Sequence, residues 1–239
     1  MSYTTSHTHK PEKEKVRSMF NDIAHKYDFL NHFLSVGIDI QWRKRVRRLL
    51  AKHNPKRILD VATGTGDLAI ELTKLKPDHI TGVDIAVEML EIGKVKIKQK
   101  GLTNIIDLVE GDAENLQFKD GSFDAVTVSF GVRNFETLQK GLVEINRVLT
   151  TDGIFAVLEF SKPKSFPFKQ IYNFYFKYIL PIMGKMVSKS NAAYTYLPES
   201  VQGFAEDQAF LDELTKAGFK NPKQKRLTMG IATLYSATK

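Results

Sequence analysis

The sequence predicts an α/β protein in which a mostly parallel sheet is covered by helices on both faces. Short apolar runs alternate with helical stretches from Lys56 onwards, and this alternation is typical of strand–helix–strand units. The apolar runs are nearly continuous, as expected of parallel strands that are buried on both faces. A length of 239 residues suits one such domain with a small addition, and 42% apolar residues suffice for its core.

Residues 12–52 are expected to form two or three helical pieces ahead of the sheet. In DIQWRKRVRRLLAKH, apolar side chains recur at helical spacing between Trp42 and Leu50, and the basic residues occupy the other faces. An Asn-Pro pair then ends the helix. We therefore expect an N-terminal basic helical lid over residues 1–55 and a single α/β domain over residues 56–239.

The elements of that domain follow in a regular order. Strands are predicted at RILDVA, HITGVDI, NIIDLVEG, FDAVTVSF and IFAVLEFS. Helices are predicted at GDLAIELTKL, VEMLEIGKVKIKQ, ETLQKGLVEINRVL and QAFLDELTKAG. Connections between the parallel strands should be right-handed. The last two apolar runs, KQKRLTMG and IATLYSAT, predict an antiparallel C-terminal edge strand that closes one side of the sheet.

An unusually aromatic stretch, FKQIYNFYFKYILPIMGKMV, predicts a helical insertion at about residues 166–200. Lysines and Pro181 interrupt it, so it is a poor candidate for a membrane span. It could be a helix that packs in the core. It could also be an apolar cover for a hydrophobic ligand, or a helix that lies at a membrane surface.

The formal charge of +8 arises in the N-terminal part of the chain. Residues 1–57 hold 13 Lys and Arg against 5 Asp and Glu, whereas the remainder is neutral. This asymmetry favours an anionic partner such as phospholipid, nucleic acid or an acidic substrate. A solvated helix face explains it equally well.

Cysteine is absent, which excludes disulfides, thiolate metal sites and cysteine nucleophiles. The lack of cysteine permits a reducing compartment. The polar start, MSYTTSHTHK, has no apolar segment of a secretory signal, and we expect a cytoplasmic protein. No cluster of metal-ligating residues is visible, so no metal site is expected.

A glycine loop follows the first predicted strand, in LDVATGTGD. Gly64 and Gly66 allow a tight turn and the close approach of a ligand, and Ala69 completes the pattern G-x-G-x-x-A of nucleotide-binding loops. Asp84 ends the second strand, where an acid would hold ribose hydroxyls. Because loops at the carboxyl ends of strands bind ligands in α/β sheets, the sequence predicts a nucleoside-cofactor site.

Acidic residues indicate which nucleoside cofactor this loop accepts. Asp60 precedes the loop and Asp67 ends it, and two carboxylates beside the glycines would repel the diphosphate of NAD. Asp112 at the end of the third strand could accept the adenine amine, with Ala113 beside the ring. S-adenosylmethionine carries a sulfonium and an ammonium, so the acid pattern favours it over NAD.

Several motifs together resemble a known family. LDVATGTGDLA, GVDI, GDAENLQFKDGSFDAVT and RVLTTDG are similar to the motifs of class I S-adenosylmethionine-dependent methyltransferases. YDFLNHFLSVGIDIQWR, SFGVRNF and RVLTTDGIFAVLEFSKP resemble the signatures of the ubiquinone/menaquinone C-methyltransferase family. The chain departs from the usual signatures at Leu30, at Asp39 and at Thr151-Asp152.

This resemblance implies a Rossmann-like class I methyltransferase fold and C-methylation of a polyprenylated quinol. We expect demethylmenaquinol as the substrate; the alternative is a 2-methoxy-6-polyprenyl-benzoquinol of ubiquinone biosynthesis. By analogy, cofactor contacts carry over onto Thr65, Asp84, Asp112 with Ala113, and Ser129. With the glycine loop, the expected cofactor site comprises Asp60, Gly64, Thr65, Gly66, Asp84, Asp112, Ala113 and Ser129.

The strand VTVSF runs directly into Gly-Val-Arg-Asn, which places polar groups at its tip. Arg133 is the expected electrostatic partner of the quinol oxygen once that oxygen loses its proton, and Asn134 would orient the second ring oxygen. Gly131 should leave room for the approach of the ligand. Tyr27, from the N-terminal lid, is expected to take part in catalysis as well, after Arg133 and ahead of Asn134.

Three other functions compete with this one. An NAD-dependent oxidoreductase could use the glycine loop, and an RNA methyltransferase could use the basic helix. A non-catalytic scaffold subunit could keep the fold, but the intact glycine loop, Asp84 and Arg133 argue against it. The chain shows no RNA-binding module, so no nucleic-acid partner is expected. We expect a polyprenylated quinol as the ligand and a peripheral contact of the basic N-terminal region with an anionic membrane. The sequence does not decide whether the protein forms a homodimer.

Overall fold

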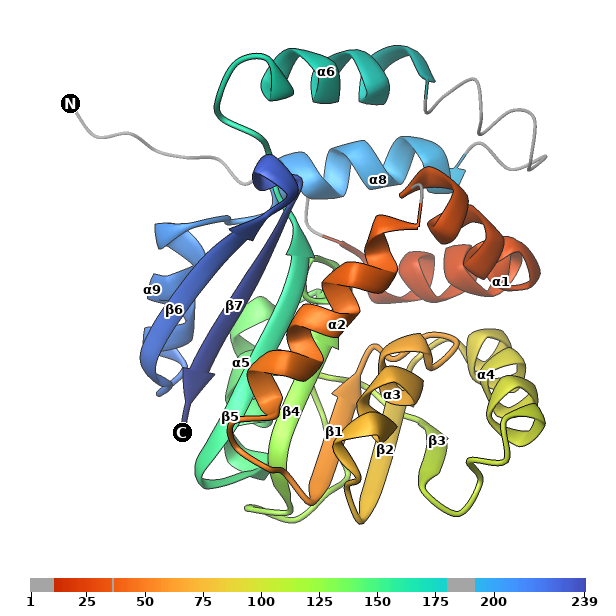
Figure 1. Ribbon diagram of the computed structural model, residues 1–239, viewed down its shortest axis with the longest axis vertical. Coiled ribbons are helices and arrows are strands. Elements are labelled where there is room, and N and C mark those ends of the chain that lie inside the picture. Colours follow the sequence, from red (N-terminus) through yellow and green to blue (C-terminus); the bar gives the residue numbers. More distant parts are fainter. Residues whose placement is uncertain (1–10, 36, 180–191) are drawn as a thin grey trace.

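The computed structural model describes residues 11–35, 37–179 and 192–239. Its centre is a seven-stranded sheet in the order β3-β2-β1-β4-β5-β7-β6 (Figure 1). The strands are β1 (Arg57–Val61), β2 (His79–Asp84), β3 (Ile106–Glu110), β4 (Phe123–Ser129), β5 (Leu149–Phe160), β6 (Lys220–Leu227) and β7 (Ala232–Thr238).

The first five strands are parallel, and β7 is antiparallel to both of its neighbours. The predicted α/β sheet and the antiparallel closure of one side are therefore confirmed. The last strand of the chain is inserted between β5 and β6, so that β6 is outermost. This arrangement lets the apolar β7 be buried, whereas β6, with its lysines, stays largely exposed.

Helices cover the two faces of the sheet as the strand–helix alternation predicts. One apolar cluster joins the sheet to α2 (Ile38–Leu50), α3 (Asp67–Leu72) and α4 (Val87–Gln99). A second cluster on the opposite face joins it to α5 (Leu138–Val148) and α9 (Gln208–Lys216). In β1, Ile58 belongs to the first cluster and Leu59 to the second, because successive side chains of a strand point to opposite faces.

Three helices lie beyond the carboxyl ends of the parallel strands (Figure 1): α1 (Lys13–Leu34), α6 (Phe168–Phe174) and α8 (Ala192–Gly203). A π-helical turn, Tyr175–Ile179, continues α6. The aromatic insertion predicted at about 166–200 is thus helical where it is described, and residues 180–191 of that prediction lie outside the described residues. Within the described part of the chain, no helix is long and apolar enough to cross a membrane.

Many basic residues of the N-terminal segment pair with acids of the α/β domain. Lys13, Arg17, Arg43, Arg47 and Arg57 each form an ion pair with an acidic residue beyond position 57. In α2, Trp42 and Val46 are buried in the same apolar cluster as the sheet. The N-terminal charge excess therefore helps to hold these helices on the domain, which is a use of that charge that the sequence alone did not reveal.

Candidate active site

A cleft opens at the carboxyl ends of β1, β2, β3 and β4. Its walls come from α1, from the glycine loop (residues 62–66) and from the segments that follow β2, β3 and β4. The space between these walls is open to solvent and measures about 670 Å³ with its mouth included. The cleft thus occupies the edge at which open α/β sheets bind ligands.

Most of the predicted site residues meet in this cleft. The predicted cofactor residues that line it are Gly64, Asp84, Asp112, Ala113 and Ser129. The predicted catalytic residues that line it are Tyr27 and Asn134. The predicted residues that do not line it are Asp60, Thr65, Gly66 and Arg133.

The glycine loop has a backbone conformation that requires its glycines. Gly64 and Gly66 have φ values of 57° and 78°, in the left-handed region where a Cβ atom brings strain. Asp84 accepts a hydrogen bond from the Gly64 N–H at 2.8 Å and another from the Ala86 N–H at 2.9 Å. Burial raises the pKa of Asp84, although these hydrogen bonds oppose the shift. Asp84 therefore anchors the loop and also contributes to the wall of the cleft.

Asp60 supports the glycine loop from behind. Its side chain accepts hydrogen bonds from Thr63 Oγ1 at 2.7 Å and from Thr127 Oγ1 at 2.6 Å. The residue is only 1% exposed, and burial raises its pKa to about 6. Asp60 therefore connects β1 to β4 and to the loop, and it reaches a ligand in the cleft only through the loop that it holds.

Helix α1 closes over the cofactor side of the cleft. Thr65 Oγ1 donates a hydrogen bond to Asp28 of α1, and Lys96 Nζ lies 2.7 Å from the same carboxylate. Lys13 Nζ lies 2.6 Å from Asp112 Oδ2. Burial alone would lower the pKa of Lys13, but its hydrogen bond and charge pairing with Asp112 raise it. Lys13 was not among the predicted site residues, because no local pattern in the sequence distinguishes it from other surface lysines.

The Gly-Val-Arg-Asn segment packs directly against the glycine loop. A Cβ atom on Gly131 would lie 2.4 Å from the Cβ of Ala62. The absence of a side chain at Gly131 thus lets two segments of the protein approach each other. The prediction from the sequence was that this glycine makes room for the ligand. Both residues line the cleft, so this contact fixes how close the glycine loop lies to the segment that follows β4.

Arg133 is buried, and this differs from its expected position facing the quinol. Its Nη1 lies 2.7 Å from Glu159 Oε1, and the two side chains are 6% and 0% exposed. Nη1 also donates to the carbonyl of Phe130, and Nε donates to Ser200 Oγ at 3.2 Å. A glutamate within an apolar strand was the signal in the sequence that could have revealed this pair. Glu159 compensates the charge of the guanidinium. Through its contacts with Glu159 in β5 and Ser200 in α8, Arg133 holds its own segment between these two elements.

Asn134 and Tyr27 both line the cleft. The Tyr196 hydroxyl, from α8, donates a hydrogen bond to Asn134 Oδ1 at 2.9 Å. The amide oxygen thus accepts from Tyr196, and the N–H₂ group of the same amide can only donate. The Tyr27 ring packs edge-on against Phe20, with 5.9 Å between centroids. Tyr196 was not among the predicted residues, since only the fold brings α8 beside this segment.

The charges of the cleft fit a cationic cofactor. Its walls include the carboxylates of Asp84, Asp112 and Glu114 against one cation, Lys13. The excess of negative charge would repel a diphosphate and attract a sulfonium or an ammonium. Gly64, which lines the cleft in the left-handed conformation, brings no side chain between its backbone and a ligand. S-adenosylmethionine meets both conditions, whereas NAD does not. Among the residues that the structure describes, no group of three His, Cys, Asp or Glu could hold a metal ion.

Comparisons with known proteins agree with this chemistry. The model of the ubiE/COQ5 methyltransferase family matches residues 8–239. Demethylmenaquinone methyltransferase of Bacteroides fragilis is 44% identical over 229 residues, which are 95% of this chain and 94% of the relative. The ubiquinone/menaquinone biosynthesis C-methyltransferase UbiE of Citrifermentans bemidjiense is also 44% identical, over 95% of this chain and 97% of the relative.

Solved structures share the fold at low sequence identity. A SAM-dependent methyltransferase from Thermotoga maritima superposes with a TM-score of 0.65 at 21% identity, over 93% of this chain and 99% of the other. The sheet order and the flanking helices described above are thus those of class I methyltransferases. The fold and the acid-lined cleft with its glycine loop agree with the match over residues 8–239. The chain therefore belongs to the ubiE/COQ5 methyltransferase family.

Proposed function

We propose that the protein transfers a methyl group from S-adenosylmethionine to a ring carbon of demethylmenaquinol. The observation that carries this proposal is the 43–44% identity, over nearly the whole chain, to relatives named demethylmenaquinone methyltransferase. The cleft supports it because its carboxylates suit a cationic methyl donor. Bound S-adenosylmethionine supplies the electrophilic methyl group.

The residues of the chain would align the quinol and stabilise its ionised oxygen. A ring carbon ortho to a hydroxyl becomes nucleophilic when that hydroxyl loses its proton, so a donor aimed at the oxygen favours the reaction. The Asn134 amide, whose oxygen accepts from Tyr196, would donate to the quinol oxygen. Tyr27 would contact the ring from α1, beside the glycine loop.

Arg133 would act as a positioning residue in this mechanism. Its charge is compensated by Glu159 at 2.7 Å, so its field at the quinol oxygen would be weak. The pair fixes the segment that carries Asn134.

The cofactor would contact Gly64, Asp84, Asp112, Ala113 and Ser129, and would be supported indirectly by Asp60, Thr65 and Gly66.

A benzoquinol is the second candidate substrate, because the Citrifermentans relative is named for both quinone pathways. Quinone profiling of a strain that lacks the gene, by mass spectrometry, separates the two. Accumulation of demethylmenaquinone supports the proposal. Accumulation of a benzoquinone precursor supports the second candidate instead, and an unchanged quinone pool would refute both.

We also propose that the protein meets its quinol at the inner face of the membrane, as a cytoplasmic protein in peripheral contact. The lipid-soluble tail of the quinol supports this location. The N-terminal charge excess supports it less than the sequence suggested, because five of those cations pair with acids of the protein itself.

A further inference from the structure

An apolar surface is exposed around α6. We define it by Phe166, Ile171, Phe174, Tyr178 and Ile179, which are 80%, 60%, 58%, 50% and 37% exposed. Among the described residues, these five make up half of the large hydrophobic side chains that are exposed. No residue of α6 itself is buried. A helix of a water-soluble protein normally buries its apolar side, so this surface indicates a partner.

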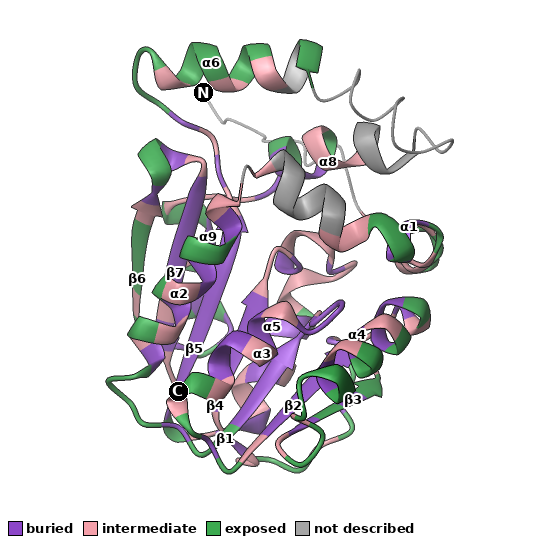
Figure 2. Cartoon of the chain, turned by 45° about the vertical axis from the view of Figure 1, so that its right-hand side comes forward, coloured by how far each residue is buried: buried purple, intermediate pink, exposed green. Residues whose placement is uncertain are grey.

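The apolar surface lies at the end of the molecule that carries the cleft. In Figure 1, α6 is the outermost helix beyond the carboxyl ends of the parallel strands, with α8 between it and the sheet. Figure 2 shows from a second direction that α6 stands away from the sheet and is exposed along much of its length. A partner that covers α6 therefore faces the same end of the protein as the mouth of the cleft.

The sequence around this surface is basic. Between Phe160 and Pro198 it contains six lysines and no aspartate or glutamate. Lys162 and Lys164 pair with Glu206 and Asp207 of the domain, and Lys169, next to the apolar surface, is exposed. Aromatic side chains interleaved with lysines suit an interface between water and an anionic bilayer. The same charges oppose a second copy of the chain, because the contact would bring lysines against lysines.

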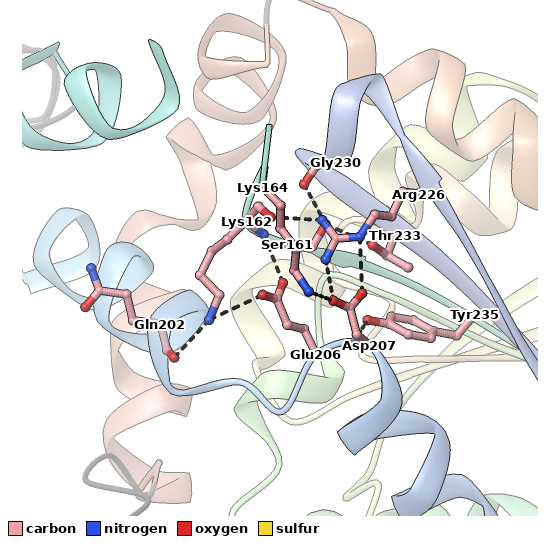
Figure 3. Close-up of polar contacts among 10 residues, drawn as sticks. All are labelled: Ser161, Lys162, Lys164, Gln202, Glu206, Asp207, Arg226, Gly230, Thr233 and Tyr235. Carbon is pink, nitrogen blue, oxygen red and sulfur yellow. Dashed lines mark hydrogen bonds and ion pairs between the residues drawn. The ribbon is translucent and has the colours of Figure 1, made fainter. Parts of the chain in front are cut away.

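The segment that leads to the apolar surface is fixed to the domain by a polar cluster (Figure 3). Arg226 forms an ion pair with Asp207, and its Nη1 donates to the Lys162 carbonyl at 2.9 Å. Lys164 pairs with the same Asp207, and Ser161 Oγ donates to the Gly230 carbonyl at 2.8 Å. The chain between β5 and α6 is thus anchored to the domain at Ser161, Lys162 and Lys164.

We infer that the apolar surface around α6 docks the protein on an anionic lipid bilayer. The apolar side chains would enter the boundary between headgroups and acyl chains, and the lysines would meet the phosphates. This inference rests on the proposed function, since a quinol with a long apolar tail resides in the bilayer. It moves the membrane contact from the basic N-terminal region to the aromatic segment.

Flotation with vesicles tests the docking surface. The test variant is Phe166→Glu with Phe174→Glu. The matched control is Val95→Glu with Val143→Glu, which places the same charges at side chains that are 56% and 50% exposed on other helices. On vesicles of phosphatidylglycerol and phosphatidylcholine, the test variant should bind at least 10-fold more weakly than the wild type, and the control should bind normally. Vesicles of phosphatidylcholine alone should bind the wild type weakly.

Equal binding of the test variant and the wild type would overturn the inference, as would the absence of wild-type binding. Loss of a wild-type dimer in the test variant, detected by light scattering, would overturn it in favour of a second copy as the partner.

A second assay separates this inference from the proposed function. The test variant should methylate a short-tailed, soluble demethylmenaquinol as fast as the wild type, but should act at least 10-fold more slowly on a long-tailed quinol in vesicles. If the wild type fails on the soluble quinol, the proposed function is wrong, and the flotation result still decides the docking surface. Thermal melting of both variants checks that they are folded.

Discussion

Arg133 Nη1 lies 2.7 Å from Glu159 Oε1 in a pair from which solvent is excluded. The same carboxylate accepts hydrogen bonds from the backbone N–H groups of Arg133 at 3.3 Å and of Phe160 at 2.8 Å. The pair therefore joins the segment after β4 to the end of β5. Because Asn134 lies on that segment, its position in the cleft depends on a charge pair that does not itself line the cleft.

Arg133→Met and Glu159→Gln should lower kcat by similar factors and leave the affinity for S-adenosylmethionine nearly unchanged. Each variant should also lower the free energy of unfolding by about 3 kcal/mol, since each leaves one buried partner uncompensated. Steady-state kinetics and calorimetric titration measure the two effects. The double variant should be no slower than the slower single variant, because the two residues act as one unit. A far greater loss for Arg133→Met than for Glu159→Gln would instead assign Arg133 a direct contact with the quinol.

Asn134→Ala should lower kcat by a factor of about 10²–10³, because it removes a donor to the ionised quinol oxygen. Tyr196→Phe keeps the amide but loses the hydrogen bond that orients it, so it should lower kcat by about 10-fold. Both variants should bind the cofactor like the wild type in a calorimetric titration. A rise in KM without a change in kcat would contradict this role, since it would mean that Asn134 binds the ground state and the transition state equally.

Lys13→Gln should tighten the binding of S-adenosylmethionine by about 2- to 5-fold. Lys13 and the adenine amine compete for the carboxylate of Asp112, and a pair that is 28% and 32% exposed is worth only about 1 kcal/mol or less. Lys15→Gln is the matched control, because Lys15 lies on the same helix and its exposed side chain pairs with Glu12. Unchanged or weaker binding in Lys13→Gln would show that the cofactor does not take Asp112 from Lys13.

Asp60→Asn should change the pH dependence of stability. Burial raises the pKa of Asp60 from 3.8 to about 6, so the folded state holds this proton more tightly than the unfolded state does. The wild type therefore loses stability at this residue as the pH rises from about 4 to 6, by about 3 kcal/mol in all. The Asp60→Asn variant does not lose stability in this way. The difference in the free energy of unfolding between the variant and the wild type should therefore shift by about 3 kcal/mol in favour of the variant between pH 4 and pH 7, as measured in denaturant titrations. A difference that does not vary with pH would count against the raised pKa.

The sheet and the cofactor wall of the cleft could be predicted because their signals are local. Continuous apolar runs identify buried parallel strands, and the glycines and acids follow those strands directly in the sequence. Since parallel strands end at one edge, Gly64, Asp84 and Asp112 had to meet there. The structure confirms that they line one cleft.

The rest of the site depends on contacts between distant parts of the chain. Glu159 meets Arg133 because Ser129 pairs with Leu158 in the register of β4 and β5, and that register cannot be read from either strand alone. Tyr196 reaches Asn134 only through the position of α8. The N-terminal charge excess was similarly ambiguous until its partners in the domain were visible.

Methyl transfer by the purified protein tests the central claim most directly. The protein is incubated with S-adenosylmethionine that carries a CD₃ group and with reduced demethylmenaquinone, and the quinones are analysed by mass spectrometry with fragmentation. We expect menaquinone with one CD₃ group on a ring carbon, formed at a rate that falls sharply in Asn134→Ala. A CD₃ group on a quinol oxygen, or no labelled quinone at all while the protein binds S-adenosylmethionine, would contradict this claim.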